Sequence, residues 1–311
     1  VIFKTLPHGL VKLLRVSFFM VRPHEYEVAD QVGGVKSSPP AIQRFKAKAE
    51  KKLAAISAAI AAGTYRPRPL VEVPIVSGER TRVLHIPSVA DRVVARAVLE
   101  HVNPRVDPLL GDCAFGSRPG LGVRDAIQAL VRKRELGYEW VLRTDVDNCF
   151  PAMSRDLALS RIEPFLLHKT VKQVVVALLS RRISSKHGTA GSGLPQGCPL
   201  SPLLANLVLA EADEAMQLAG FQPVRYVDDI AVATRDRQEA ETALLMLSRA
   251  LRELGLEVGA DKTEIMSFTE GFCFLGEDFG PRYPASISTH RVEEPVKRVL
   301  YIGLDGSCAT V

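Results

Sequence analysis

The stretch PVRYVDDIAVAT, residues 223–234, predicts two short β-strands, 223–227 and 230–234, with an acidic pair at the tip between them. The pair is Asp228 and Asp229. Two like charges a few ångströms apart repel, and removal from water raises the cost, so such a pair usually indicates a bound cation. The competing interpretation is a solvated turn, because aspartate favours turns through local hydrogen bonds. A third carboxylate at the end of another strand would decide between them.

Asp145 is the candidate for that third carboxylate. Residues 139–146 alternate as a strand, with the mostly apolar Trp140, Leu142, Thr144 and Val146 on one face and Asp145 at the end of the opposite face, away from the apolar side. If this strand lies beside the acidic hairpin, the three carboxylates converge. Oxygen ligands of this kind suit Mg²⁺ or Mn²⁺, and a two-metal site suits in-line phosphoryl transfer. Taken alone, Asp145 also fits a helix N-cap or a turn.

Composition favours an ordinary globular protein with an ample core. The chain has 311 residues, 47% of them hydrophobic, and 40 Lys and Arg against 35 Asp and Glu give a net charge of +5. Basic residues are dense from Arg44 to Arg96, in the N-terminal part of the chain. This distribution fits a polyanion such as nucleic acid. A solvated helix face is the alternative for Lys46 to Lys52.

Cysteine usage and hydropathy indicate the compartment. The five cysteines are widely spaced and form no CxxC pair, which argues against a zinc site or a disulfide framework and favours a reducing cytoplasm. The chain contains no run of about 18 uncharged apolar residues, so we expect no membrane span. It begins at Val1 rather than Met, and we expect it to be a piece of a longer polypeptide.

The segment GLPQGCPLSP, residues 193–202, is the second strong signal. Its prolines and glycines shape a loop, and we expect Ser201 to cap a helix whose first residue is Pro202. Apolar residues at helical spacing follow, which leaves the loop free to contact a ligand. A helix start of this kind is most often structural. This loop becomes a candidate for a functional site because, in the sequence, it lies between the strand that ends at Asp145 and the hairpin that carries Asp228 and Asp229.

Upstream, the pattern predicts helices and a basic hairpin. We expect a helix over 40–62 that ends at Gly63, a hairpin with Arg80 and Arg82 at its edge, and amphipathic helices over 89–102 and 122–137. A loop between those two helices carries Arg118. This arginine either meets a phosphate or is an ordinary surface arginine.

In this order the motifs resemble those of reverse transcriptases. The matching segments are Asp145 with Phe150, GLPQGCPLSP at 193–202, YVDD at 226–229, GLEVGADKT at 255–263 and FLG at 274–276. Upstream, RVLHIPSVADRVV and FGSRPGLGVRDA look like the fingers blocks of the bacterial group II intron branch. The resemblance covers residues 41–280.

The resemblance implies an α+β right-hand polymerase fold with fingers and palm, an antiparallel palm sheet backed by helices, and a thumb that is short or absent. It also implies domain boundaries. We expect an N-terminal extension or the end of an upstream domain over 1–39, fingers with part of the palm over 40–138, the palm with the catalytic centre over 139–280, a linker over 281–298, and the start of a downstream domain over 299–311.

Roles for single residues follow from the same resemblance. Asp145, Asp228 and Asp229 would bind two Mg²⁺ ions, or Mn²⁺, and Lys262 would stand near the leaving pyrophosphate as a proton donor. Phe150 would block a ribose 2′-hydroxyl and select deoxynucleotides, with a plain core phenylalanine as the alternative.

Other residues would hold the nucleic acid and the triphosphate. Gln196 and Gly197 would line the pocket for the template and the incoming nucleotide. Arg80, Arg82 and Arg118 are the candidates for gripping the triphosphate. The implied partners are an RNA template, a DNA or RNA primer and deoxynucleoside triphosphates (dNTPs).

Two settings fit the loop at 196–202, which has the QGxxxSP form of intron and CRISPR-associated enzymes. Residues 282–290 lack helical periodicity, and VLYIGLDGSCATV at 299–311 looks like the opening β-hairpin of the CRISPR spacer integrase. We therefore expect a fusion with that integrase in cis, acting with its small adaptation partner in acquiring spacers from RNA. The alternatives are a group II intron-encoded reverse transcriptase and a noncatalytic RNA-binding palm. A nucleotide cyclase would not explain the loop or Phe150.

Overall fold

The computed structural model describes residues 40–77, 80–181, 183–184, 193–281, 300–302 and 308–310. Its helices in chain order are α2 (Pro40–Lys46), α3 (Ala49–Ala61), α4 (Val89–Val106), α5 (Val123–Glu135), α6 (Cys149–Ala152), α7 (Arg155–Ile162), α8 (Lys169–Leu179), α9 (Ser201–Leu218) and α10 (Arg237–Glu253). Short 3₁₀ helices are η3 (Asp107–Leu109), η4 (Glu163–Phe165) and η5 (Ala260–Lys262). The strands are β1 (Leu70–Ser77), β2 (Arg80–Ile86), β3 (Trp140–Asp145), β4 (Ile183–Ser184), β5 (Pro223–Tyr226), β6 (Asp229–Thr234), β7 (Glu264–Ser267), β8 (Phe272–Phe274), β9 (Glu277–Phe279), β10 (Leu300–Ile302) and β11 (Cys308–Thr310).

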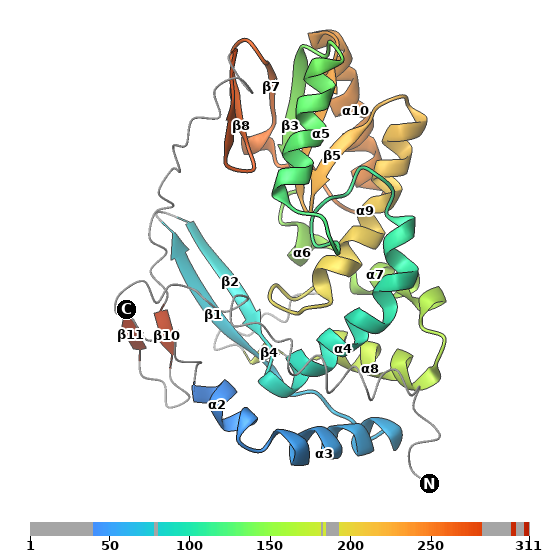
Figure 1. Ribbon diagram of the computed structural model, residues 1–311, viewed down its shortest axis with the longest axis vertical. Helices are drawn as coiled ribbons and strands as arrows, with labels where there is room; N and C mark the ends of the chain where they lie inside the picture. Colours follow the sequence, from blue (N-terminus) through green and yellow to red (C-terminus); the bar gives the residue numbers. More distant parts are fainter. Residues whose placement is uncertain are drawn as a thin grey trace.

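A four-stranded antiparallel sheet in the order β5-β6-β3-β7, here called the palm sheet, carries the acidic residues. Helix α5 lies on one of its faces and helices α9 and α10 lie on the other (Figure 1). Alternation along β3 sends Leu142 into the core with α9 and α10, and Val141 into a second core with α5. The fold class expected from the sequence, an antiparallel palm sheet backed by helices, is confirmed.

The second face of β3 is less polar than the sequence pattern predicts. Val141 is buried under α5, and Asp145, further along the same face, is also buried, with 5% of its surface exposed. Asp145 therefore does not point into solvent. The groups that bury Asp145 belong to the site described below.

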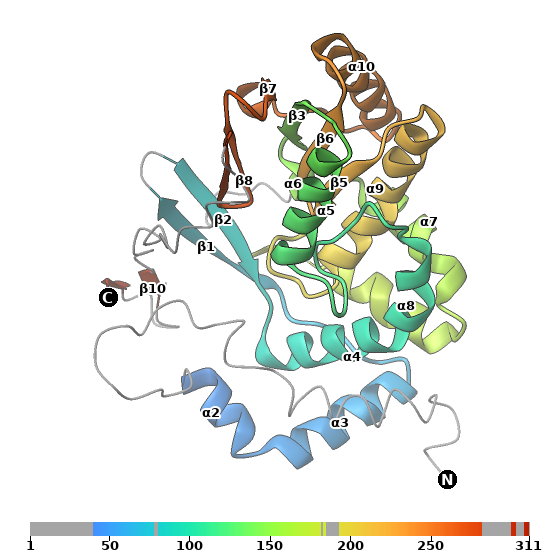
Figure 2. The same cartoon turned by 45° about the horizontal axis from the view of Figure 1, so that its top comes forward.

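A second lobe contains the hairpin of β1 and β2, with β4 beside β1, and the helices α2, α3, α4 and α8 (Figures 1 and 2). Helices α2 and α3 lie at the end of the molecule farthest from the palm sheet. The single helix expected over 40–62 is interrupted at Ala47 and Lys48. Lys46, Lys48 and Lys51 are exposed, as the alternative of a solvated helix face requires.

Helix α9 begins one residue before the predicted position. Leu200 is its N-cap, and the Ser201 hydroxyl does not cap the helix but donates a hydrogen bond to the Pro195 carbonyl at 2.8 Å. A buried hydroxyl needs a partner, and here it ties the loop back onto the helix start. The predicted Ser201 cap is therefore wrong, although the loop and the helix are in the expected places.

The C-terminal strand pair is confirmed, because β10 pairs antiparallel with β11. Residues 1–39 and 282–299 lie outside the described residues, and with them lie the expected N-terminal extension, most of the linker and the question of a thumb. Over the part of the chain that the structure covers, no helix combines the length and the apolar character needed to cross a bilayer.

Candidate catalytic centre

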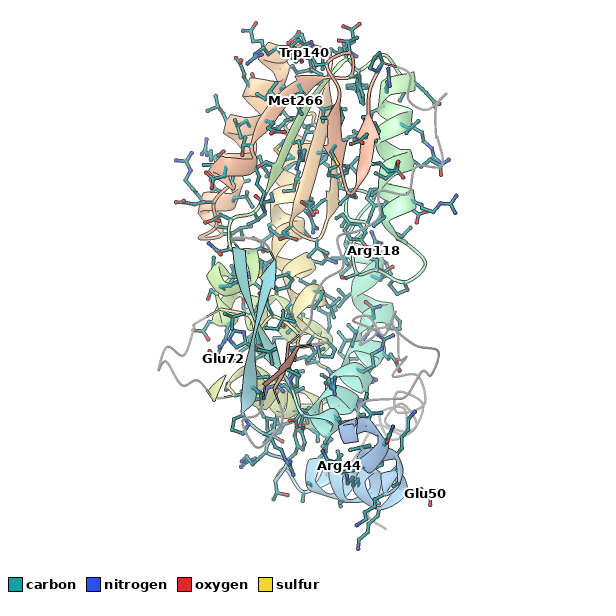
Figure 3. The ribbon with its side chains drawn as sticks, turned by 90° about the vertical axis from the view of Figure 1, so that its left-hand side faces the viewer. Arg44, Glu50, Glu72, Arg118, Trp140 and Met266 are labelled. Atoms are coloured by element: carbon teal, nitrogen blue, oxygen red, sulfur yellow. The ribbon has the colours of Figure 1, made fainter. Side chains whose placement is uncertain are left out.

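The palm sheet brings the three predicted carboxylates to one place. Trp140 marks the outer end of β3 in Figure 3, and the strand runs from there towards the second lobe and ends at Asp145. In the antiparallel register Asp145 stands opposite Asp229, and the Val146 amide donates a hydrogen bond to the Asp228 carbonyl at 3.0 Å. Two strand ends that are far apart in the sequence therefore meet as the sequence predicts.

The turn that carries Asp228 is strained. Tyr226 pairs with Asp229, so Val227 and Asp228 alone connect β5 to β6. Val227 has φ +60°, a left-handed conformation that β-branched residues rarely adopt. Such a conformation costs about 1–3 kcal/mol and persists only where the surrounding structure enforces it, often at functional sites.

The segment after α10 encloses Asp145. The Gly259 amide donates to the Asp145 carbonyl at 2.9 Å, and the Lys262 ammonium contacts Asp145 Oδ2. A Cβ atom at Gly259 would lie 2.0 Å from Asp145 Oδ1, so no side chain fits there. The backbone at Gly259 has φ −72°, which means that close approach, and not backbone conformation, requires the glycine.

Electrostatics at the three carboxylates favour a cation. Desolvation, reinforced by the charges of Asp228 and Asp145, raises the pKa of Asp229, although Asp229 as a residue is exposed and Lys262 opposes the shift. Burial, with Asp228 as the next cause, raises the pKa of the nearby Cys149 thiol to about 12. Asp145 Oδ1 is buried without a hydrogen-bond partner. A bound cation would lower the pKa values of Asp229 and Cys149 again, and it would give Asp145 Oδ1 a partner.

The three carboxylates do not form a closed ligand set. Within the described ranges, no three His, Cys, Asp or Glu side chains are arranged to hold a metal ion by themselves. This agrees with the chemistry of Mg²⁺, which is usually held by one or two carboxylates together with water and substrate phosphates. The donor atoms therefore suit Mg²⁺ or Mn²⁺ bound together with a nucleotide. In this structure, Lys262 lies beside Asp145.

Phe150 and the loop over 193–198 pack together beside this centre. Asn148, with φ +44°, turns the chain from β3 into α6, which places Phe150 in the first turn of that helix. The Leu194 amide donates to the Phe150 carbonyl at 2.7 Å, and Arg155 Nε donates to the Gly193 carbonyl at 2.6 Å. Phe150 is half-buried against the main core, so one part of its ring packs and another part faces outward.

The same loop is joined to the second lobe. The His85 amide of β2 donates to the Gln196 carbonyl at 2.7 Å, and Gly197 is exposed next to it. Gln196 is half-buried. Both residues therefore lie where β2 and the loop meet. Arg80 and Arg82 are on β2, but their side chains lie outside the described residues.

Arg118 has a different environment from the expected one. Its guanidinium binds both carboxylate oxygens and the carbonyl of Asp107 and the carbonyls of Gly111 and Ala114. These five acceptors match the five N–H donors of an arginine, so none remains for a triphosphate. Only 10% of the side chain is exposed. Arg118 is thus neither a phosphate ligand in this geometry nor a surface arginine, but fastens the loop over 107–118.

The structure also reveals a buried polar cluster that the sequence did not indicate. Arg225, which precedes Tyr226, is paired with Asp213 and Asn206 of α9, and all three are buried. The available signal was an arginine inside an otherwise apolar strand, with an aspartate among the buried positions of α9. Gly116 lies against Val227 in the same region.

Comparison with known proteins gives a consistent family. Residues 77–297 match the family model described as reverse transcriptase (RNA-dependent DNA polymerase). Protein YkfC of Escherichia coli (strain K12) is 26% identical over 260 residues, which are 69% of this chain and 67% of that protein. The group II intron-encoded protein LtrA of Lactococcus lactis subsp. cremoris is 28% identical over 170 residues, 53% of this chain but only 28% of LtrA.

Two solved structures align with most of this chain. Telomerase from Candida albicans, in complex with a fragment of telomeric RNA, aligns with a TM-score of 0.52 and 14% identity over 78% of this chain and 48% of that chain. A partial Cas6-RT-Cas1–Cas2 complex aligns with a TM-score of 0.43 and 22% identity over 78% of this chain and 40% of that one. The likeness to telomerase concerns the fold alone, and no argument is based on the likeness to the second structure.

Proposed function

This chain belongs to the reverse transcriptase (RNA-dependent DNA polymerase) family, and we propose that it synthesises DNA on an RNA template by nucleotidyl transfer. The observation that supports this best is the meeting of Asp145, Asp228 and Asp229 at adjoining strand ends. The proposed substrates are a primer strand, DNA or RNA, and dNTPs.

Asp145, Asp228 and Asp229 are the proposed metal ligands. When bound, two Mg²⁺ ions would activate the primer 3′-hydroxyl and neutralise charge on the α-phosphate. The unpartnered Asp145 Oδ1 and the raised pKa of Asp229 support this assignment. Lys262 Nζ contacts Asp145 Oδ2 and carries a proton that it could give to the leaving pyrophosphate.

The residues around the carboxylates would select the substrate. Phe150 is half-buried beside the end of β3, where its outward-facing part would exclude a ribose 2′-hydroxyl. Gln196 and Gly197, at the meeting of the loop with β2, would contact the template and the incoming base. Arg80 and Arg82 remain the candidates for the triphosphate, on the strand that approaches this loop.

A primer-extension assay tests the proposal. The wild-type chain should extend oligo(dT) on poly(rA) with dTTP and Mg²⁺ or Mn²⁺, whereas Asp228→Asn should bind the same duplex without incorporating nucleotide. Binding without incorporation in both proteins would favour a noncatalytic RNA-binding palm. Equal incorporation by both proteins would remove Asp228 from the catalytic centre.

For the biological setting, we favour a fusion with the CRISPR spacer integrase, used with its small adaptation partner to acquire spacers from RNA. The antiparallel pair of β10 and β11 at the chain end supports this choice, because such a hairpin is what the tail motif predicts. A group II intron-encoded enzyme is the second candidate, favoured by the 28% identity to LtrA. Sequencing the reading frame beyond Val311 separates them, since only the first requires an integrase domain there.

We also propose a location in a reducing cytoplasm. Its support is that the cysteines whose side chains the structure describes, Cys113, Cys149, Cys198 and Cys273, are all free thiols.

A further inference from the structure

We propose that Arg225 is a positioning residue that holds the Val227–Asp228 turn in its active geometry, with Asp213 and Asn206 holding Arg225 in turn. This inference rests on the proposed function, because it assigns the residues that fix one of the proposed metal ligands. It concerns side chains that would touch neither substrate nor metal. All three side chains are buried, and they link β5 to α9.

Among the residues that the structure describes, Arg225 is one of the largest fully buried side chains, with 1% of its surface exposed. Its Nε lies 3.0 Å from both carboxylate oxygens of Asp213, and its Nη2 lies 2.6 Å from Asp213 Oδ2. Its Nη1 donates to Asn206 Oδ1 at 2.8 Å and to the Val227 carbonyl at 3.0 Å. The guanidinium therefore joins α9 to the turn through charge-assisted hydrogen bonds, of which those to Asp213 and Asn206 are buried and the one to the Val227 carbonyl is partly buried.

The opposite side of the turn is held by the loop that contains Gly116. Asn206 Nδ2 donates to the Gly116 carbonyl at 2.9 Å, so one amide contacts both Arg225 and this loop. Gly116 approaches Val227 so closely that a Cβ atom there would lie 2.5 Å from the Val227 nitrogen. The Arg225 backbone also bonds to Cys113 and Phe115, at 2.8 Å each.

The turn needs such support because Val227 is in a conformation that it would not keep alone. At φ +60° a β-branched residue returns to a negative φ unless its surroundings prevent it. Asp228 follows directly, so any relaxation at Val227 moves the Asp228 carboxylate. The contact between Arg225 and the Val227 carbonyl opposes that relaxation from within the core.

The simpler alternative is that the ion pair of Arg225 and Asp213 only stabilises the fold. A double variant, Asp213→Leu with Arg225→Met, separates the two roles. Replacing a buried ion pair by apolar side chains of similar size often preserves stability, whereas removing one partner leaves a buried charge. The double variant therefore keeps apolar side chains in the core without an unpaired buried charge, and it loses the contacts of Arg225 to the Val227 carbonyl and to Asn206 Oδ1. The control is Arg161→Met with Glu211→Leu, the same kind of substitution at a half-exposed ion pair between α7 and α9 that does not touch the turn.

Two measurements on the full chain decide the question. The first is amide hydrogen exchange of a peptide covering residues 223–232, compared with peptides from α9 and α10. The second is single-turnover incorporation of dTTP on poly(rA)/oligo(dT), with binding of the duplex measured separately. If Arg225 positions the turn, the double variant should exchange faster over 223–232 only and should incorporate at a rate lower by about 10-fold or more. Its thermal midpoint and its duplex binding should stay near those of the control.

Unchanged exchange over 223–232 in a folded double variant would overturn the inference, whatever the activity. Should the double variant lose its fold, Asn206→Leu takes its place, because it removes the links to Arg225 and to the Gly116 carbonyl while Arg225 stays paired with Asp213, and the same local exchange is expected. A wild-type chain that incorporates no nucleotide would count against the proposed function. The exchange measurement would still test whether Arg225 holds the Val227–Asp228 turn, so the failure of the inference and the failure of the proposed function are distinguishable.

Discussion

The substitution Gly259→Ala should displace the Asp145 carboxylate while changing the stability of the fold only a little. The new Cβ would lie 2.0 Å from Asp145 Oδ1 and 3.1 Å from its Cγ, whereas real Cβ atoms essentially never approach other atoms closer than 3.0 Å. The carboxylate must therefore move by at least about 1 Å, a displacement that can cost on the order of 100-fold in rate. The backbone at Gly259, with φ −72° and ψ 102°, accepts an alanine without strain.

We expect Gly259→Ala to lower the rate constant of single-nucleotide incorporation by about 100-fold, while overpacking destabilises the fold by only about 1–3 kcal/mol. Rapid-quench incorporation and thermal unfolding measure the two quantities. Gly280→Ala is the matched control, because nothing lies within 4 Å of its Cβ position and its φ is not positive. Incorporation by Gly259→Ala at the rate of Gly280→Ala would refute the close packing of Gly259 on a catalytic carboxylate.

The remaining predictions concern selectivity, loop structure and pH. Phe150→Ala should incorporate ribonucleotides, measured as the ratio of rates for UTP and dTTP, and an unchanged ratio would argue for a plain core phenylalanine. Arg118→Met should lower the free energy of unfolding by about 2 kcal/mol, since it leaves Asp107 without its partner, and should leave the KM for dTTP unchanged. Burial, together with Arg105 and His168, lowers the pKa of His101 below 6.5, so the unfolded chain binds the proton more tightly. Stability from His101 is therefore present above pH 6.5 and falls as the pH drops below it, and thermal unfolding of His101→Gln should depend less on pH over that range.

The meeting of the carboxylates could be predicted from the sequence because it depends on local patterns. Alternation ends β3 at Asp145, and the hairpin over 223–234 places Asp228 and Asp229 at a strand end. The register between β3 and β6 was the part that the sequence could not predict. The motif order supplied the expectation that these strands are neighbours, and the antiparallel pairing of Asp145 with Asp229 agrees with it.

The buried polar contacts could not be predicted in this way. Arg118 and Arg225 are both arginines next to motif residues, and both are satisfied by partners that folding brings close, Asp107 and Asp213. The choice of partner depends on tertiary packing, which no local pattern reports. The strain at Val227 was also hidden, because a valine gives no sign of a left-handed φ.

The most direct test of a DNA-synthesising centre is the incorporation of one deoxynucleotide on an RNA template by the wild-type chain and by Asp145→Asn, with Mg²⁺ or Mn²⁺. Asparagine keeps the size of the buried side chain and removes the charge that we assign to metal binding. We predict incorporation by the wild type, none detectable by Asp145→Asn, and the same thermal stability or a higher one for the variant. Incorporation by Asp145→Asn at the wild-type rate would contradict the account.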